Sequence, residues 1–168
     1  MEAHQKQITV YSNHTESAPV IYLPVVVGDG SEVYKCCREL NCPPFALVTI
    51  GGLDWNRELS PWACDGTVRD AEPFGGQAAD FLDELLNQII PQVESSLPQP
   101  PTWRGIAGYS LAGLFALWSL WQTDAFDRAA VLAVLEQNAA RAAEKAAAIP
   151  EYPRHGKTGI QPTKVPQT

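Results

Sequence analysis

The segment RGIAGYSLAGLFALWSLWQ, residues 104–122, decides how this chain folds. It consists of a short apolar run, a turn of small residues around Ser110, and a second, longer apolar run. The first run predicts a buried strand over 103–108, and the last predicts a buried helix over 114–121. The sequence therefore predicts a strand that passes directly into a helix, with Ser110 at the turn between them.

Ser110 stands in the pattern Gly108-Tyr109-Ser110-Leu111-Ala112, which matches the nucleophile elbow G-x-S-x-G with alanine in place of the second glycine. Small residues two before and two after the serine let the strand and the helix approach closely. The helix then directs its free N–H groups at negative charge that develops on a substrate oxygen. Ser110 is therefore a candidate nucleophile and the N–H of Leu111 a candidate oxyanion donor. The alternative is that Ser110 only caps the helix.

The segments before this unit alternate between strand and helix patterns. Strands are predicted at 7–10, 20–23 and 44–52, and helices at 31–40 and 77–97. An irregular connection, 53–76, separates the third strand from the second helix. This order is typical of an α/β protein whose mostly parallel sheet is flanked by helices.

Three local expectations concern the ends of these elements. Pro24 has no N–H to donate, so the strand that begins at residue 20 is expected to end near Leu23. Ser31 is expected to cap the helix 31–40. Pro91 is expected to kink the helix 77–97 or end its regular part. The apolar face predicted for the helix 31–40 consists of Val33, Cys36, Cys37 and Leu40.

By its length of 168 residues the chain is one domain. We expect the α/β domain to span 1–150, with an alanine-rich helix over its last part, 128–150. The segment 151–168 is rich in proline and has little apolar material to bury, so it is expected to be a flexible, irregular tail.

Composition excludes several classes of partner. The net charge is −7 and no cluster of Lys and Arg exists, which argues against nucleic acid and anionic membranes. No apolar run approaches the ~20 residues of a membrane span. The N-terminus lacks the pattern of a secretory signal, so a cytoplasmic protein is expected. The spacing of Cys36, Cys37, Cys42 and Cys64 fits no zinc or CxxC motif, so we expect free thiols and neither metal nor cofactor.

Three segments together resemble the α/β-hydrolase superfamily: DWNRELSPW, FLDELLNQIIPQVE and GYSLAGLFALWSL. The chain is most similar to a bacterial esterase group that includes esterase D and the siderophore esterases, over roughly residues 18–130. This resemblance implies a serine hydrolase that cleaves a small-molecule carboxylic ester through an acyl-enzyme on Ser110. It also implies a second oxyanion donor in the loop after the strand 20–23, and Val25 is chosen because Pro24 has no N–H. The pocket wall implied by the resemblance contains Arg57, Glu58 and Trp62.

The catalytic acid and base that a serine hydrolase needs are difficult to assign in this sequence. In this fold they follow the serine in the order acid, then histidine, and the only histidine after Ser110 is His155. In one interpretation the tail folds back and His155 completes a triad, with an acid such as Glu151 or Glu144. In the other, the chain is truncated or divergent after about residue 130 and keeps a partial α/β-hydrolase fold without its base.

Two further functions stay open at the level of sequence. The chain could be a non-catalytic α/β-hydrolase-like domain with a structural or interaction role, which forms a homodimer through an exposed sheet edge. It could also be an acyltransferase, because only the acceptor of the acyl group differs from that of a hydrolase.

Overall fold

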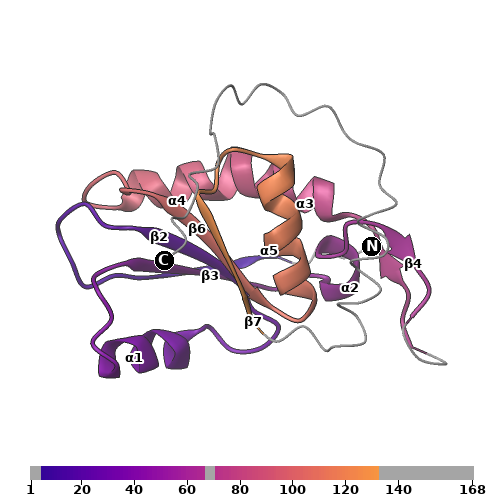
Figure 1. Ribbon diagram of the computed structural model, residues 1–168, viewed down its shortest axis with the longest axis horizontal. Helices are drawn as coiled ribbons and strands as arrows, with labels where there is room; N and C mark the ends of the chain where they lie inside the picture. The colour runs from indigo at the N-terminus through magenta and orange to yellow at the C-terminus, as the bar shows by residue number, and fades with distance from the viewer. Residues whose placement is uncertain (1–4, 67–70, 133–168) are drawn as a thin grey trace, which may run out of the picture. The chain divides into compact units, whose positions relative to one another are not determined.

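The computed structural model describes residues 5–66 and 71–132. A five-stranded sheet of order β1-β3-β2-β6-β7 forms its centre (Figure 1). The strands are β1 (Gln7–Tyr11), β2 (Val20–Pro24), β3 (Ala46–Gly51), β6 (Arg104–Tyr109) and β7 (Arg128–Leu132). Adjacent strands from β3 to β7 are parallel, and only β1 runs antiparallel to its neighbour β3. The prediction of a mostly parallel sheet is confirmed.

Helices cover both faces of the sheet, as Figure 1 shows. One face carries α1 (Ser31–Glu39), and the other carries α3 (Ala78–Glu84), the π-helical turn η1 (Leu85–Ile89), α4 (Ile90–Ser96) and α5 (Leu111–Gln122). The main core lies between the sheet and the second group of helices, and includes Tyr22, Val48, Ile50, Phe81, Ile106 and Phe115. A smaller cluster on the α1 face consists of Leu23, Val25, Leu47 and Ala107.

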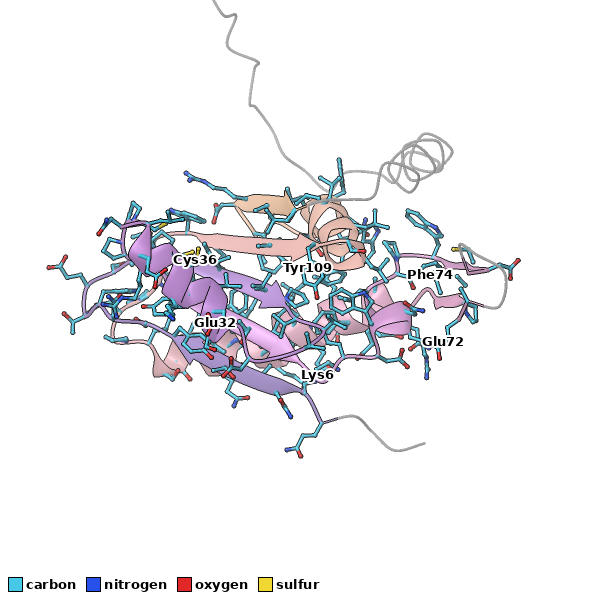
Figure 2. All side chains as sticks on the ribbon, turned by 90° about the horizontal axis from the view of Figure 1, so that it is seen from below. Lys6, Glu32, Cys36, Glu72, Phe74 and Tyr109 are labelled. Carbon is cyan, nitrogen blue, oxygen red and sulfur yellow. The ribbon has the colours of Figure 1, made fainter. Side chains whose placement is uncertain are left out.

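The connection between β3 and α3 holds three short elements. They are α2 (Trp55–Glu58), β4 (Ala63–Cys64) and β5 (Phe74–Gly75). β4 and β5 pair as an antiparallel hairpin that extends from one end of the molecule, where Figure 2 labels Phe74. The predicted irregular connection is therefore locally ordered at both of its ends.

Two of the sequence predictions about α1 are wrong. Its N-cap is Gly30, at φ 81°, and Ser31 is the first helical residue. The capping oxygen comes from Asp29, whose carboxylate accepts the N–H of Ser31 at 3.0 Å. The predicted apolar face is also wrong, because Val33 and Leu40 are 45% and 72% exposed and α1 contains no buried residue.

An aromatic contact joins α1 to the sheet instead of that apolar face. Tyr34 stacks on Tyr11 of β1 with ring centroids 5.4 Å apart, and it meets Phe45 edge-on at 5.8 Å. An amphipathic pattern alone does not say which residue of a helix meets the sheet, because half-exposed aliphatic side chains satisfy the same period.

The start of the predicted alanine-rich helix is a strand. Residues 128–132 form β7, which pairs in parallel with β6 from Gly105 to Tyr109. High helix propensity is overridden here because β6 offers a row of backbone groups that only a strand can satisfy. The rest of the predicted helix, 133–150, and the predicted tail, 151–168, lie outside the described residues.

Pro91 neither ends nor breaks the helical segment that contains it. Helix continues from Ala78 to Ser96, and the irregularity is the π-helical turn at 85–89, which lies immediately before the proline. A proline inside a helix removes one N–H donor, and a wider turn beside it absorbs the loss. Among the described residues, no helix combines the length and the apolar character that crossing a membrane requires.

Candidate active site

Ser110 occupies a strained backbone position between β6 and α5. Its φ of 52° and ψ of −124° fall in a region that residues other than glycine rarely adopt, and such strain is typical of functional sites. The Ser110 side chain makes no capping hydrogen bond to α5. The geometry therefore favours the nucleophile elbow. The alternative, a serine that only caps the helix, requires a side-chain hydrogen bond to α5, and Ser110 makes none.

Gly108 explains why the elbow needs a small residue two positions before the serine. A Cβ atom on Gly108 would lie 2.2 Å from the carbonyl carbon and oxygen of Ala112 and 2.6 Å from the nitrogen of Gly113. These atoms belong to the backbone of α5, which cannot move without moving the helix. Only glycine lets β6 and α5 approach this closely.

Backbone hydrogen bonds fix Ser110 from both sides. Its N–H donates to the carbonyl of Leu132 at the end of β7 (3.2 Å), and its carbonyl accepts the N–H of Gly113 (3.0 Å) and of Leu114 (3.2 Å). β7 therefore contributes directly to the elbow. The sequence analysis missed this role because residues 128–132 show helix propensity and no strand pattern.

The two predicted oxyanion donors lie in different situations. Leu111 is half-buried and is the first residue of α5, where an N–H has no acceptor within the helix. The N–H of Val25, in contrast, donates to the carbonyl of Ile50 on β3 at 2.9 Å, and the residue is buried. This hydrogen bond extends the β2–β3 ladder by one residue, so Val25 cannot donate to a substrate oxygen and that assignment is corrected.

The loop from Val25 to Gly30 is anchored against β3. The hydroxyl of Thr49 donates to the carbonyl of Asp29 at 2.6 Å. A Cβ atom on Gly30 would lie 2.3 Å from the Thr49 methyl carbon, so the contact requires glycine at that position. The backbone that leads from β2 to α1 is thereby held at the carboxyl edge of the parallel strands, beside the elbow.

One side of the elbow is covered by an aromatic pair. Trp55 of α2 packs against Tyr109, the residue before Ser110, with ring centroids 5.5 Å apart. Figure 2 labels Tyr109 at the end of β6. Of the predicted wall residues, Arg57 and Trp62 are partly exposed, and Arg57 donates to the side chain of Gln77 at 3.2 Å. Trp55 is the wall residue that sequence reasoning missed, although it lies within the DWNRELSPW segment.

Glu58, another of the predicted wall residues, holds α2 in place through its carboxylate. Its carboxylate accepts the N–H of Asp54 at 2.7 Å and the ammonium of Lys6 at 2.6 Å. Lys6 also binds Glu84 of α3 at 2.7 Å and lies 5.4 Å from the ring centre of Phe81. We call Lys6, Glu58, Glu84 and Phe81 the Lys6 cluster. It ties the start of β1 to α2 and α3.

The electrostatics of the Lys6 cluster favour the charged lysine. Burial of the ammonium acts to lower the pKa of Lys6, but hydrogen bonds and charge attraction from Glu58 and Glu84 outweigh it and raise this pKa above its ordinary value. No sequence pattern marked Lys6, which stands among polar residues near the N-terminus.

In the described part of the chain, no histidine lies at the edge of the sheet that carries Ser110. The single described histidine, His14, precedes β2, at the opposite edge of the parallel strands from the elbow, and its Nδ1 lies 2.8 Å from the carbonyl of Glu16. Asp127 accepts the N–H of Arg104 at 2.9 Å at that same far edge. His155, the predicted candidate, lies outside the described residues. Within 5–66 and 71–132 no group of three or more His, Cys, Asp and Glu is arranged to hold a metal ion.

A mostly parallel sheet covered on both faces, with a strained serine between a strand and the following helix, is typical of an α/β-hydrolase-type fold. The family model described as "Putative esterase" matches residues 25–152, which is more than half of the chain. The chain belongs to this family. It is also 31% identical over 120 residues to "Uncharacterized protein YbbA" of Bacillus subtilis (strain 168), covering 66% of this chain and 46% of that protein.

Solved structures share the fold. The BES protein from Bacillus cereus has a TM-score of 0.61 at 20% identity, covering 77% of this chain and 57% of that one. An IroE-like serine hydrolase from Shewanella oneidensis has a TM-score of 0.59 at 21% identity, with 74% and 44% covered. The siderophore hydrolase EstA from Aspergillus nidulans has a TM-score of 0.57 at 23% identity, with 74% and 51% covered. This chain spans about half the length of these proteins.

Proposed function

We propose that this chain carries the nucleophile half of a serine esterase that acts on a small-molecule carboxylic ester. The observation that carries the proposal is Ser110 at φ 52°, held in a strained elbow with no capping hydrogen bond. Membership of the esterase family supports the reaction class. The names of two structural neighbours, a serine hydrolase and a siderophore hydrolase, agree with hydrolysis by a serine.

The reaction proceeds in two halves. The Ser110 hydroxyl attacks the ester carbonyl carbon, a base accepts its proton, and the alcohol leaves with a proton returned from that base. Water then attacks the acyl-serine and releases the acid. The oxyanion of each tetrahedral intermediate is stabilised by the N–H of Leu111 at the start of α5.

The second oxyanion donor is assigned to Val26 in place of Val25. The N–H of Val25 donates to β3, whereas that of Val26, the next residue of the same loop, donates no hydrogen bond to another described residue. Val26 is 52% exposed and lies in the loop that leads from β2 to α1.

The base lies outside the described residues in this proposal, and His155 is the candidate. Without its histidine a triad enzyme keeps only the rate that binding and the oxyanion hole supply, which is on the order of 10³–10⁴ over water. We therefore expect slow turnover from any arrangement in which His155 does not reach Ser110.

A fluorophosphonate probe tests the nucleophile. We expect the folded full chain to bind one probe at Ser110, and Ser110→Ala to abolish labelling, with Ser95→Ala as the matched control that leaves labelling unchanged. Absence of labelling in well-folded protein would contradict the proposal and favour a non-catalytic domain. His155→Ala addresses the base separately: an unchanged labelling rate would remove His155 from the mechanism and leave Ser110 in place.

A further inference from the structure

The C-terminal end of α1 is a Schellman motif. The N–H of Cys42 donates to the carbonyl of Cys37 at 3.0 Å, and the N–H of Asn41 donates to that of Arg38 at 3.0 Å. Asn41 has the left-handed φ of 54° that the motif requires. This motif brings the side chain after the left-handed residue into contact with the side chain third from the helix end. Here both of these positions are cysteines.

The two thiols share one environment. Both residues line an open hollow of about 70 Å³, whose walls include Tyr34, Pro43 and Phe45. Burial raises the pKa of the Cys37 thiol, and the charge of the Cys42 thiol and a hydrogen bond with it raise that pKa further. Cys42 is exposed and Cys37 is half-buried. Cys42 is thus open to solvent, and Cys37, on the same hollow, is less accessible.

The remaining cysteines are placed differently. Cys36 precedes Cys37 on the helix, and adjacent helical residues do not face each other. Cys64 pairs with Phe74 on the hairpin, and Figure 2 shows Phe74 at the opposite end of the molecule from Cys36. Of the four cysteines, only Cys37 and Cys42 are brought together by a defined backbone motif.

We propose that Cys37 and Cys42 form a redox-active dithiol that exchanges with small-molecule disulfides and closes an intramolecular disulfide. The thiolate of the exposed Cys42 attacks the small disulfide, which releases one thiol and leaves a mixed disulfide on Cys42. Cys37 then loses its proton and attacks the Cys42 sulfur, which releases the second thiol. One small-molecule disulfide is reduced to two thiols while the protein dithiol is oxidised.

Oxidised glutathione, alkylation of the remaining thiols and tryptic peptide mapping test the pair on the full chain. Cleavage after Lys35, Arg38 and Arg57 places Cys37 in peptide 36–38 and Cys42 in peptide 39–57. We expect these two peptides to be disulfide-linked in the oxidised protein. The link persists in Cys36→Ser and in the control Cys64→Ser. Cys37→Ser instead carries glutathione on Cys42.

A second pair of variants tests the motif itself. Asn41→Gly keeps the left-handed turn, and we expect it to form the disulfide as the unmodified chain does. Asn41→Val puts a β-branched residue at positive φ, and we expect the ratio of intramolecular to mixed disulfide to fall on the order of tenfold. Loss of the link in Cys36→Ser, a link within peptide 36–38 alone, or glutathione on both Cys37 and Cys42 of the unmodified chain would overturn the proposal.

Discussion

At the scale of single residues, Ser110 combines a backbone that is unfavourable for serine with a side chain that no capping bond holds. The strain persists because hydrogen bonds to Leu132, Gly113 and Leu114 determine the path of the chain around it. A strained backbone position of this kind costs stability. The cost should be measurable once the hydroxyl is removed.

We expect Ser110→Gly to be more stable than Ser110→Ala by about 1–2 kcal/mol, because glycine adopts positive φ without strain and alanine does not. Both variants lose the hydroxyl, so the comparison isolates the backbone. Urea unfolding monitored by tryptophan fluorescence gives the two free energies of unfolding. Equal stabilities would show that the elbow is unstrained in solution.

At the scale of elements, the Lys6 cluster holds together three segments that are distant in sequence. Lys6 lies just before β1, Glu58 ends α2, and Glu84 ends α3. The side chains of Lys6 and Glu58 are only 15% and 20% exposed, so their attraction is screened less than that of a surface pair. Because α2 also carries Trp55, the cluster positions the aromatic wall beside Tyr109.

Lys6→Met and Glu58→Ala should each lower the free energy of unfolding by roughly 1–3 kcal/mol, and the double variant by less than their sum. Glu39→Ala, an exposed carboxylate on α1, should change it by less than about 0.5 kcal/mol. Urea unfolding of the unmodified chain, the two single variants at Lys6 and Glu58 and their double variant gives the coupling energy. Additive single effects would mean that the two side chains do not interact.

The coupling should also depend on pH. The folded state raises the pKa of Lys6, so the stability that this proton provides is complete below the ordinary lysine range. It disappears as the pH rises through the raised value. We therefore expect the coupling energy to be unchanged between pH 7 and pH 9 and to fall only in more alkaline solution.

At the scale of the whole molecule, β7 is one of the two edge strands of the described sheet, with β1 at the other edge. It pairs with β6 on one side and has no second neighbour among the described strands. Val131 and Leu132 are 40% and 59% exposed, and Trp121 of α5 is 66% exposed. An apolar edge strand of this kind is open to pairing with another chain. We propose a second copy as that partner, with the two β7 strands antiparallel about a two-fold axis.

Leu132→Lys should shift the protein towards the monomer, because a charge on an edge strand opposes pairing. Sedimentation equilibrium of the unmodified chain should show a mass that increases with concentration, and the variant should not. Leu40→Lys, at the exposed C-cap of α1, is the matched control and should leave association intact. An unchanged mass for Leu132→Lys would place any dimer interface elsewhere.

The sequence predicted most of the sheet and the strand–turn–helix unit around Ser110, because both depend on local patterns. Continuous apolar runs indicated β2, β3 and β6, and the small residues around Ser110 indicated the strand–turn–helix unit. The pattern failed where long-range contacts decide the outcome. Residues 128–132 form a strand because their backbone groups pair with β6. The N–H of Val25 is occupied because it donates to β3. Lys6 forms its ion pairs only because the fold brings α2 and α3 to it.

The π-helical turn at 85–89 determines the rotational phase of everything that follows it in the helix. A π turn holds one residue more than an α turn, which corresponds to about 100° of rotation. Glu94 reaches Tyr22 (3.2 Å) and binds Arg104 through both carboxylate oxygens only in the phase that this extra residue sets. Deleting a single residue between 85 and 89 would restore an ordinary α-helix and turn Glu94 away from both partners. A change of one residue in the length of this helix therefore reaches partners on β2 and β6.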